Sequence, residues 1–138
     1  MSVIEFRLLV DFGLLILIWM IQLIVYPSFV QFDEDKLRAW HPTYNRMITL
    51  IVAPLMFAQL GLVLWQIGQV QDFYTWSSAI LVLVAWVLTF FQAVPLHHKI
   101  SAGKEVRESA RKLVKANIWR SIVWTAAFLF SLFKVMGG

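Results

Sequence analysis

The sequence predicts an all-α membrane protein, a four-transmembrane-helix bundle with up-and-down connections. The chain has 138 residues, of which 60% are hydrophobic and 14% charged, and its mean hydropathy is +0.73. This composition is too apolar for an ordinary small soluble domain. Four separate runs are long enough to cross about 30 Å of hydrocarbon, which takes about 20 apolar residues. Most charged residues fall between these runs, in two connections of the chain.

The four spans are expected at residues 8–28, 46–68, 76–96 and 116–135, within one domain that covers residues 1–138. Glu5 and Arg7 precede the first run and no small-residue cleavage site follows it, so we expect an uncleaved helix rather than a signal peptide. The chain contains no cysteine. This excludes disulfides, thiolate metal sites and covalently attached c-type haem.

A short repeat favours two similar helix hairpins. "IVYPSF" closes the first span much as "AVPLHH" closes the third, and "NRMITLIV" opens the second much as "NIWRSIVW" opens the fourth. Two hairpins with the same orientation would bring corresponding residues to the same end of the bundle. A match of so few residues can also arise by chance.

The basic residues predict the orientation. Nearly all of them lie in the connections that follow the first and third spans, whereas Arg7 and Lys134 lie toward the other end. By the positive-inside rule these two connections face the cytoplasm and both termini lie outside it. The formal charge of +4 then reflects topology and contact with anionic lipid headgroups, so no nucleic-acid partner is expected.

Polar residues within the spans recur every three or four positions, as on one face of a helix. The first span carries a stripe of Asp11, Gln22 and Tyr26, and the fourth carries a stripe of Asn117 and Arg120. His41 and Tyr44 lead into the second span, which contains Gln59, and Thr89 and Gln92 lie in the third span, with His97 just after its end. Polar groups that face hydrocarbon are costly, so the stripes should turn inward and meet.

One set of these residues is expected to converge at the cytoplasmic end. We call it the polar cup; it contains all three histidines of the chain and comprises Tyr26, His41, Tyr44, His97, His98, Asn117 and Arg120. Neutral imidazole is the commonest protein ligand for transition metals, so the histidines are candidate ligands of a metal or of haem b. A carboxylate could complete a metal site, and the nearby candidates are Asp33, Glu34, Asp35 and Glu105.

Only one of His97 and His98 can face the bundle, because successive helical side chains point about 100° apart. His97 shares a face with Trp86 and Phe90, which favours it as the inward residue. The cofactor-binding pair is then His41 and His97, holding haem b or a transition metal such as iron or copper, with His98 as the remaining metal candidate.

Two classes of function fit the polar cup. In a membrane oxidoreductase or oxygenase, Tyr26 and Tyr44 would donate hydrogen bonds or protons, and Arg120, with Asn117 beside it, would neutralise a developing anion on a lipophilic substrate. The alternative is a non-enzymatic carrier or a proton or ion relay. Structural explanations also exist, because a histidine at a helix end can bind headgroups and Arg120 can snorkel toward phosphate.

The order of these residues resembles small four-span bacterial membrane proteins. The resemblance is carried by Tyr26-Pro27, His41, Pro54, Gln59, Val94-Pro95-Leu96-His97, Asn117, Trp119, Arg120 and Trp124. More distantly the chain is similar to the anthrone-oxygenase-like membrane family, whose third span also ends in a proline-containing motif and whose fourth opens with an Asn and Arg pattern.

The resemblance implies oxidation of polycyclic aromatic substrates with molecular oxygen, in a bacterial inner membrane. The doubled histidine at 97 and 98 departs from the family pattern, which leaves the ligand open. A looser, architectural likeness is to four-span haem proteins such as bacterial protoporphyrinogen oxidase. The partners expected are the lipid bilayer, a lipophilic small molecule and, through the outer helix faces, other copies in a homo-oligomer.

Overall fold

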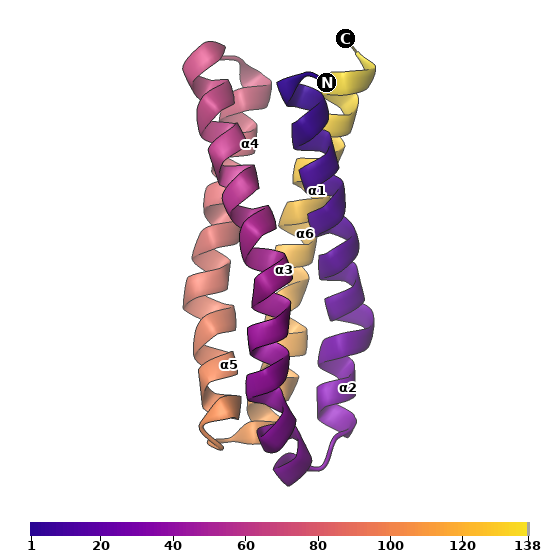
Figure 1. Cartoon of the computed structure of the whole chain (residues 1–138), viewed down its shortest axis with the longest axis vertical. Coiled ribbons are helices and arrows are strands. Elements are labelled where there is room, and N and C mark those ends of the chain that lie inside the picture. Colours follow the sequence, from indigo (N-terminus) through magenta and orange to yellow (C-terminus); the bar gives the residue numbers. More distant parts are fainter. Residues whose placement is uncertain (138) are drawn as a thin grey trace.

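Four long helical segments run side by side along the full length of the molecule, alternating in direction (Figure 1). This computed structural model describes residues 1–137. The segments are Val3–Gln31, Glu34–Gln69, Phe73–Ser101 and Val106–Met136, and each is long and apolar enough to cross a membrane. The predicted all-α four-span bundle is therefore confirmed, with both termini at the same end (Figure 1).

Two of the four segments are interrupted by a π-helical turn. The first comprises α1 (Val3–Met20), the turn Ile21–Val25 and α2 (Tyr26–Gln31), and the third comprises α4 (Phe73–Leu88), the turn Thr89–Ala93 and α5 (Val94–Ser101). The second and fourth segments are the single helices α3 (Glu34–Gln69) and α6 (Val106–Met136). Both α1 and α4 pack on α3 and on α6, so the interior is enclosed by all four segments.

The helices extend beyond the predicted spans, because the basic connections are mostly helical. Residues 34–45 begin α3 and residues 106–115 begin α6, so only residues 32–33 and 102–105 lie outside helices at this end. A hydropathy profile detects only the part of a helix that lies in hydrocarbon. The polar extensions have another helical signal, the spacing of charges, as in the ion pair of Lys112 with Glu108 (3.6 Å).

Side-chain caps define the helix starts at the end that carries the termini. Ser2 and Glu5 form a capping box at the start of α1, and Asp72 and Thr75 form one at the start of α4. The hydrogen bond that the Thr75 backbone N–H donates to the Asp72 carboxylate lowers the pKa of Asp72, which lies between two spans. These caps satisfy backbone N–H groups that have no partner within the helix.

The two hairpins share a backbone irregularity just before a proline. The N–H of Tyr26 bonds to the carbonyl of Ile21, and the N–H of Val94 bonds to the carbonyl of Thr89. Each turn is followed by a proline, which has no N–H and whose ring clashes with the carbonyl four residues back in an α-helix. The wider π turn accommodates that clash, and such turns often occur at functional sites. The sequence repeat therefore corresponds to a repeated structural element.

The bundle interior has polar groups near both ends and an apolar layer between them. The layer consists of Leu14, Ile18, Met56, Ala85 and Trp124, all of which are buried. On every segment these residues lie between the polar residues of one end and those of the other. The layer therefore separates two polar clusters.

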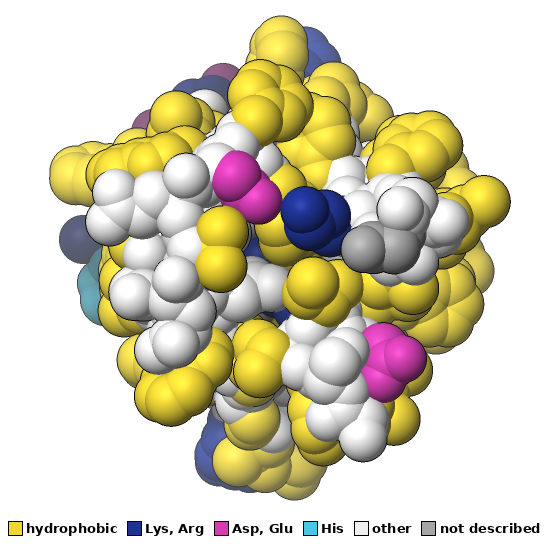
Figure 2. All heavy atoms as spheres, turned by 90° about the horizontal axis from the view of Figure 1, so that it is seen from above, with side chains coloured by type: hydrophobic (Ala, Val, Ile, Leu, Met, Phe, Trp, Pro, Cys, Tyr) yellow, Lys and Arg dark blue, Asp and Glu magenta, His cyan; other side chains and the backbone are white. Residues whose placement is uncertain are grey.

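The cluster near the termini is built around a buried ion pair. Arg7 and Asp11 are 0% and 1% exposed, and the Arg7 Nε donates to Asp11 at 3.0 Å. Arg7 also donates to Gln66 (3.0 Å), and Asp11 accepts from Gln59 (2.6 Å) and Ser131. Arg7 lies toward the end that carries the termini, as expected from the sequence, but its side chain is buried in the bundle, where it meets Asp11. Figure 2 shows this end, where few charged side chains reach the surface.

Asp11→Asn should lower the free energy of unfolding by about 3–5 kcal/mol, because it leaves the Arg7 charge buried without a counterion. Chemical unfolding in detergent micelles measures the change. Asp72→Asn is the matched control, since it removes a partly exposed ion pair with Lys134 and should cost less than about 1 kcal/mol. Equal losses in the two variants would contradict the assigned role of the Arg7–Asp11 pair.

Candidate functional site

Five members of the polar cup lie buried inside the end of the bundle opposite the termini. Tyr26 is the first residue of α2 and directly follows one π turn, and His97 lies in the first helical turn of α5, after the other. His41 comes from the early part of α3, and Asn117 and Arg120 come from α6. All five side chains are buried, with exposed fractions of 8% or less. The structure thus brings together residues from all four segments.

Three hydrogen bonds of equal length link three of these side chains and Ser101 in a row. Tyr26 Oη lies 2.8 Å from His97 Nε2, His97 Nδ1 lies 2.8 Å from His41 Nε2, and His41 Nδ1 lies 2.8 Å from Ser101 Oγ. The two imidazole rings are stacked, with centroids 5.0 Å apart. Ser101 ends α5 and is partly exposed beside the connection to α6. We call this chain the relay; it leads from the end of the bundle to its interior.

The relay has two neutral hydrogen-bonding states. A neutral imidazole has one N–H donor and one nitrogen acceptor. In one state Tyr26 donates to His97, His97 donates to His41, and His41 donates to Ser101. In the other state every one of these bonds is reversed, and each ring is again neutral. Conversion between the states takes up a proton at one end of the relay and releases one at the other.

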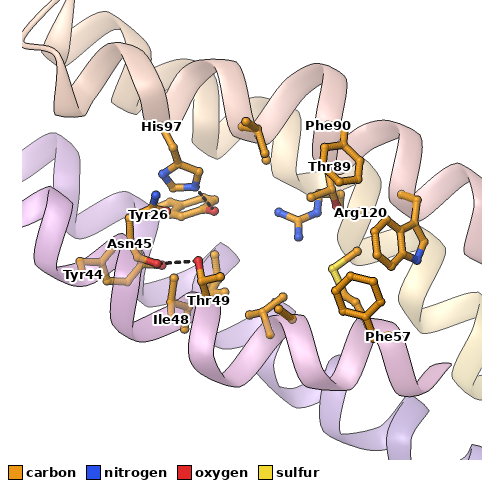
Figure 3. A pocket seen from close by; sticks show the side chains of 17 residues that line it. Tyr26, Tyr44, Asn45, Ile48, Thr49, Phe57, Thr89, Phe90, His97 and Arg120 are labelled. Carbon is orange, nitrogen blue, oxygen red and sulfur yellow. Dashed lines mark hydrogen bonds between the residues drawn. The ribbon is translucent and has the colours of Figure 1, made fainter. Parts of the chain in front are cut away.

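A pocket of about 230 Å³ lies beside the relay, between α3 and the segment formed by α4 and α5. Tyr26 and His97 lie at one end of it, Phe57 and Phe90 lie at the other, and the Arg120 guanidinium points into the space between them (Figure 3). Phe57 and Phe90 are 62% and 54% exposed on the outer surface of the bundle. The pocket therefore opens sideways, toward the hydrocarbon of a membrane.

The positive charge of Arg120 has few partners in the protein. Its Nη1 donates to Asn117 Oδ1 at 3.4 Å, its Nε is buried without a partner, and its guanidinium lies 5.0 Å from the Trp124 ring centroid. None of the ion pairs among residues 1–137 includes it. Asn117 is itself held by Gln22, whose Oε1 accepts from Asn117 Nδ2 at 2.9 Å. Asn117 and Gln22 thus position Arg120 but do not neutralise it.

The remaining two members of the polar cup make no hydrogen bond to the relay, although the Tyr44 ring lies 6.0 Å from that of His41, centroid to centroid. Tyr44 lines the pocket, packs edge-on against Phe29 and has a buried Oη without a partner. His98 is exposed, and its side chain makes no hydrogen bond with residues 1–137. Of the two adjacent histidines, His97 faces the bundle and His98 faces the surface.

The arrangement does not fit haem or metal ligation by His41 and His97. All four ring nitrogens already have hydrogen-bonding partners within the protein. Within residues 1–137, no group of three or more His, Asp or Glu side chains could hold a metal ion. The carboxylates considered from the sequence are exposed at the helix connections: Asp33, Glu34, Asp35 and Glu105. Ligation would require at least one ring to give up a hydrogen bond.

Two functional features were missed at the level of sequence. Ser101 ends the relay. It lies four residues after His97, which puts both side chains on one helix face, so helical spacing in the sequence could have identified it. The Gln22–Asn117 hydrogen bond joins two residues that were identified, but the pairing of stripes on different helices depends on tertiary packing.

Comparisons with protein-family models, with curated proteins and with solved structures find no match to this chain. The geometry of the relay and the pocket is therefore the basis for assigning a function.

His97→Ala should destabilise the protein by about 1–3 kcal/mol for each buried partner that it leaves unpaired, namely Tyr26 Oη and His41 Nε2. Unfolding in detergent micelles measures this change. His98→Ala is the matched control and should stay within about 0.5 kcal/mol of the wild type, because it alters only an exposed side chain. A larger effect from His98→Ala would show that the wrong neighbour was placed in the relay.

Proposed function

We propose that this integral membrane protein binds a lipophilic small molecule in the lateral pocket and exchanges a proton with it through the relay. The observation that carries this proposal is the unbroken chain of 2.8 Å hydrogen bonds from Tyr26 at the pocket to Ser101 at the bundle end. Positioned groups that accept or donate a proton typically accelerate such reactions by about 10²–10⁴-fold. The proposed reaction class is proton abstraction, and its reverse.

Each step moves a proton across one hydrogen bond. The bound molecule gives a proton to Tyr26 Oη while Tyr26 passes its own to His97 Nε2. His97 passes its Nδ1 proton to His41, His41 passes one to Ser101, and Ser101 releases one to water. Neither histidine is charged at the start or the end, which matters because an isolated charge is costly in an apolar interior. The reversed relay can return a proton to the pocket.

Arg120 supports the same reaction by electrostatics. Removal of a proton leaves a negative charge on the bound molecule, and the guanidinium points into the pocket where that charge would form (Figure 3). The free Oη of Tyr44 offers a further hydrogen bond. Preorganised donors act strongly in a site with apolar walls, because little solvent screens them.

An oxygenase that acts on polycyclic aromatic substrates, as the resemblance implies, would begin with the same step. Loss of a proton makes the substrate an electron-rich anion, and O₂ as co-oxidant can then accept electrons from it. This version needs no histidine-bound haem or metal. A cofactor held by His41 and His97 stays a prediction, and the hydrogen bonds at their ring nitrogens do not support it.

The alternative of an ion carrier or through-membrane relay has less support. An ion that crossed the bundle would have to pass the apolar layer between the two polar clusters, which includes Leu14, Ile18 and Trp124. Because dehydrated ions are costly in apolar surroundings, that layer favours a reaction confined to one end of the bundle.

We place the relay end in the cytoplasm of a bacterial cell, with both termini outside the inner membrane. Of twelve Lys and Arg residues, all except Arg7, Arg120 and Lys134 belong to the helix ends and connections at the relay end. Basic residues near the ends of spans are retained on the cytoplasmic side.

Site-directed labelling tests this orientation, and the absence of native cysteine makes each introduced thiol unique. Ser2→Cys should react with a membrane-impermeant maleimide in intact spheroplasts, whereas Lys104→Cys should react only after permeabilisation. Both positions are exposed at helix ends. The reverse labelling pattern would put the relay end outside the cytoplasm.

Proton exchange is tested with anthrone, a lipophilic carbon acid, in lipid nanodiscs that contain the protein. In deuterated buffer without O₂, the wild type should accelerate deuterium incorporation at the acidic carbon, as measured by mass spectrometry. Tyr26→Phe and His97→Ala should lose about 10²–10⁴-fold of that acceleration, because each breaks the relay. His98→Ala should retain it.

The same nanodiscs should consume O₂ in the presence of anthrone if proton abstraction leads to oxygenation. Wild-type rates of deuterium incorporation in folded Tyr26→Phe and His97→Ala proteins would rule out the relay as the route of the proton.

A further inference from the structure

The two buried arginines of this protein differ in their electrostatic surroundings. Arg7 is 0% exposed and pairs with Asp11 at 3.0 Å. Arg120 is 5% exposed and has no carboxylate partner among residues 1–137. One buried guanidinium is therefore neutralised by the protein, and the other is not.

An arginine cannot relieve its burial by losing its proton, because the guanidinium remains charged in proteins. A buried charge without a counterion is strongly unfavourable, particularly at membrane depth. The Arg7–Asp11 pair shows that this fold can provide a carboxylate from the next helical turn. At Arg120 the corresponding negative charge is absent from the described chain, and the guanidinium faces a pocket (Figure 3).

The polar atoms left without partners around this pocket are mainly donors. Arg120 Nε, Tyr44 Oη and Trp86 Nε1 are buried and unpaired, and all three residues line the pocket. No Asp or Glu lines it. Several free N–H and O–H groups next to an uncompensated positive charge form a site that is complementary to a negatively charged oxygen.

The shape of the pocket restricts the rest of the ligand. At about 230 Å³ it is smaller than a typical ligand pocket of about 300–1,000 Å³. It can hold a polar head and an adjoining ring, while the remainder lies in hydrocarbon outside the opening. The Trp86 and Phe90 rings are stacked at 5.6 Å, and Phe57 packs edge-on against Trp86 at 5.1 Å. This aromatic wall favours a planar ring over a flexible chain.

We propose that the pocket binds the conjugate base of a lipid-soluble aromatic weak acid, such as a phenol or enol, with its anionic oxygen on Arg120. The apolar part of the ligand passes between Phe57 and Phe90 into the bilayer. This inference rests on the proposed function in one respect, since it assumes that the ligand binds in the same lateral pocket. It does not require the relay to be the route of the proton.

The test uses 2-naphthol, whose acid and anion have different absorption spectra, with the protein in phosphatidylcholine nanodiscs. The wild type should bind the anion about tenfold more tightly than the neutral form, which lowers the apparent pKa of bound naphthol by about one pH unit. Arg120→Gln should abolish the shift and Arg120→Lys should keep part of it. Arg111→Gln, which removes an exposed arginine from the same helix, should keep all of it.

The neutral analogue 2-methoxynaphthalene shows whether the pocket survives the substitution. It should bind equally to the wild type and to Arg120→Gln, which separates loss of charge recognition from loss of fold. An unchanged shift in folded Arg120→Gln would overturn the proposal. Full displacement of naphtholate by added phosphatidylglycerol would also overturn it, because the site would then belong to a lipid phosphate.

A relay variant distinguishes this inference from the proposed function. His41 belongs to the relay but does not line the pocket, so His41→Ala should keep the naphthol shift and lose anthrone exchange. If the shift depends on Arg120 while anthrone exchange is independent of His41 and Tyr26, the anion site stands and the relay function fails. If exchange depends on the relay but no shift is found, the anion site fails.

Discussion

Hydrogen-bonding groups that are removed from water must find partners, and this constraint decides how the interior of the bundle is arranged. Near the termini, Arg7 and Asp11 neutralise each other and are held by Gln59, Gln66 and Ser131. At the opposite end, His41 and His97 bond to each other and to the hydroxyl groups of Ser101 and Tyr26. Arg120 differs from both clusters, since it alone keeps a buried charge without a counterion from the described chain, and it faces the pocket.

The position of the site follows from a backbone feature that the two hairpins share. In each hairpin a wider π turn precedes the proline that follows it, Pro27 or Pro95, and the residues within one helical turn after these π turns include Tyr26 and His97. The two hairpins are similar in backbone but differ in side chains. When Pro27 is aligned with Pro95, Tyr26 corresponds to Val94 and Phe29 corresponds to His97. The two halves therefore contribute different members of a single relay.

The relay and the pocket have complementary properties for chemistry on a lipophilic molecule. The pocket opens toward hydrocarbon, so a ligand can enter without crossing water, while the relay reaches the polar end of the bundle through Ser101. The apolar layer closes the other direction. In the proposed function a proton moves between the pocket and water on one side only, as acid–base catalysis requires and transport across the membrane does not.

The sequence alone determined the fold class. Four long apolar runs must pair all of their backbone N–H and C=O groups within lipid, and in a short chain helices are the structure that does so. Helical spacing likewise identified the residues that face inward, including Tyr26, His41, His97 and Arg120. Tertiary structure decided which of them meet: His41 bonds to His97, and Asp11 accepts from Gln59 and Ser131 on two other helices. Periodicity gives the face of one helix, whereas contacts between helices depend on axial offset and rotation, which packing alone sets.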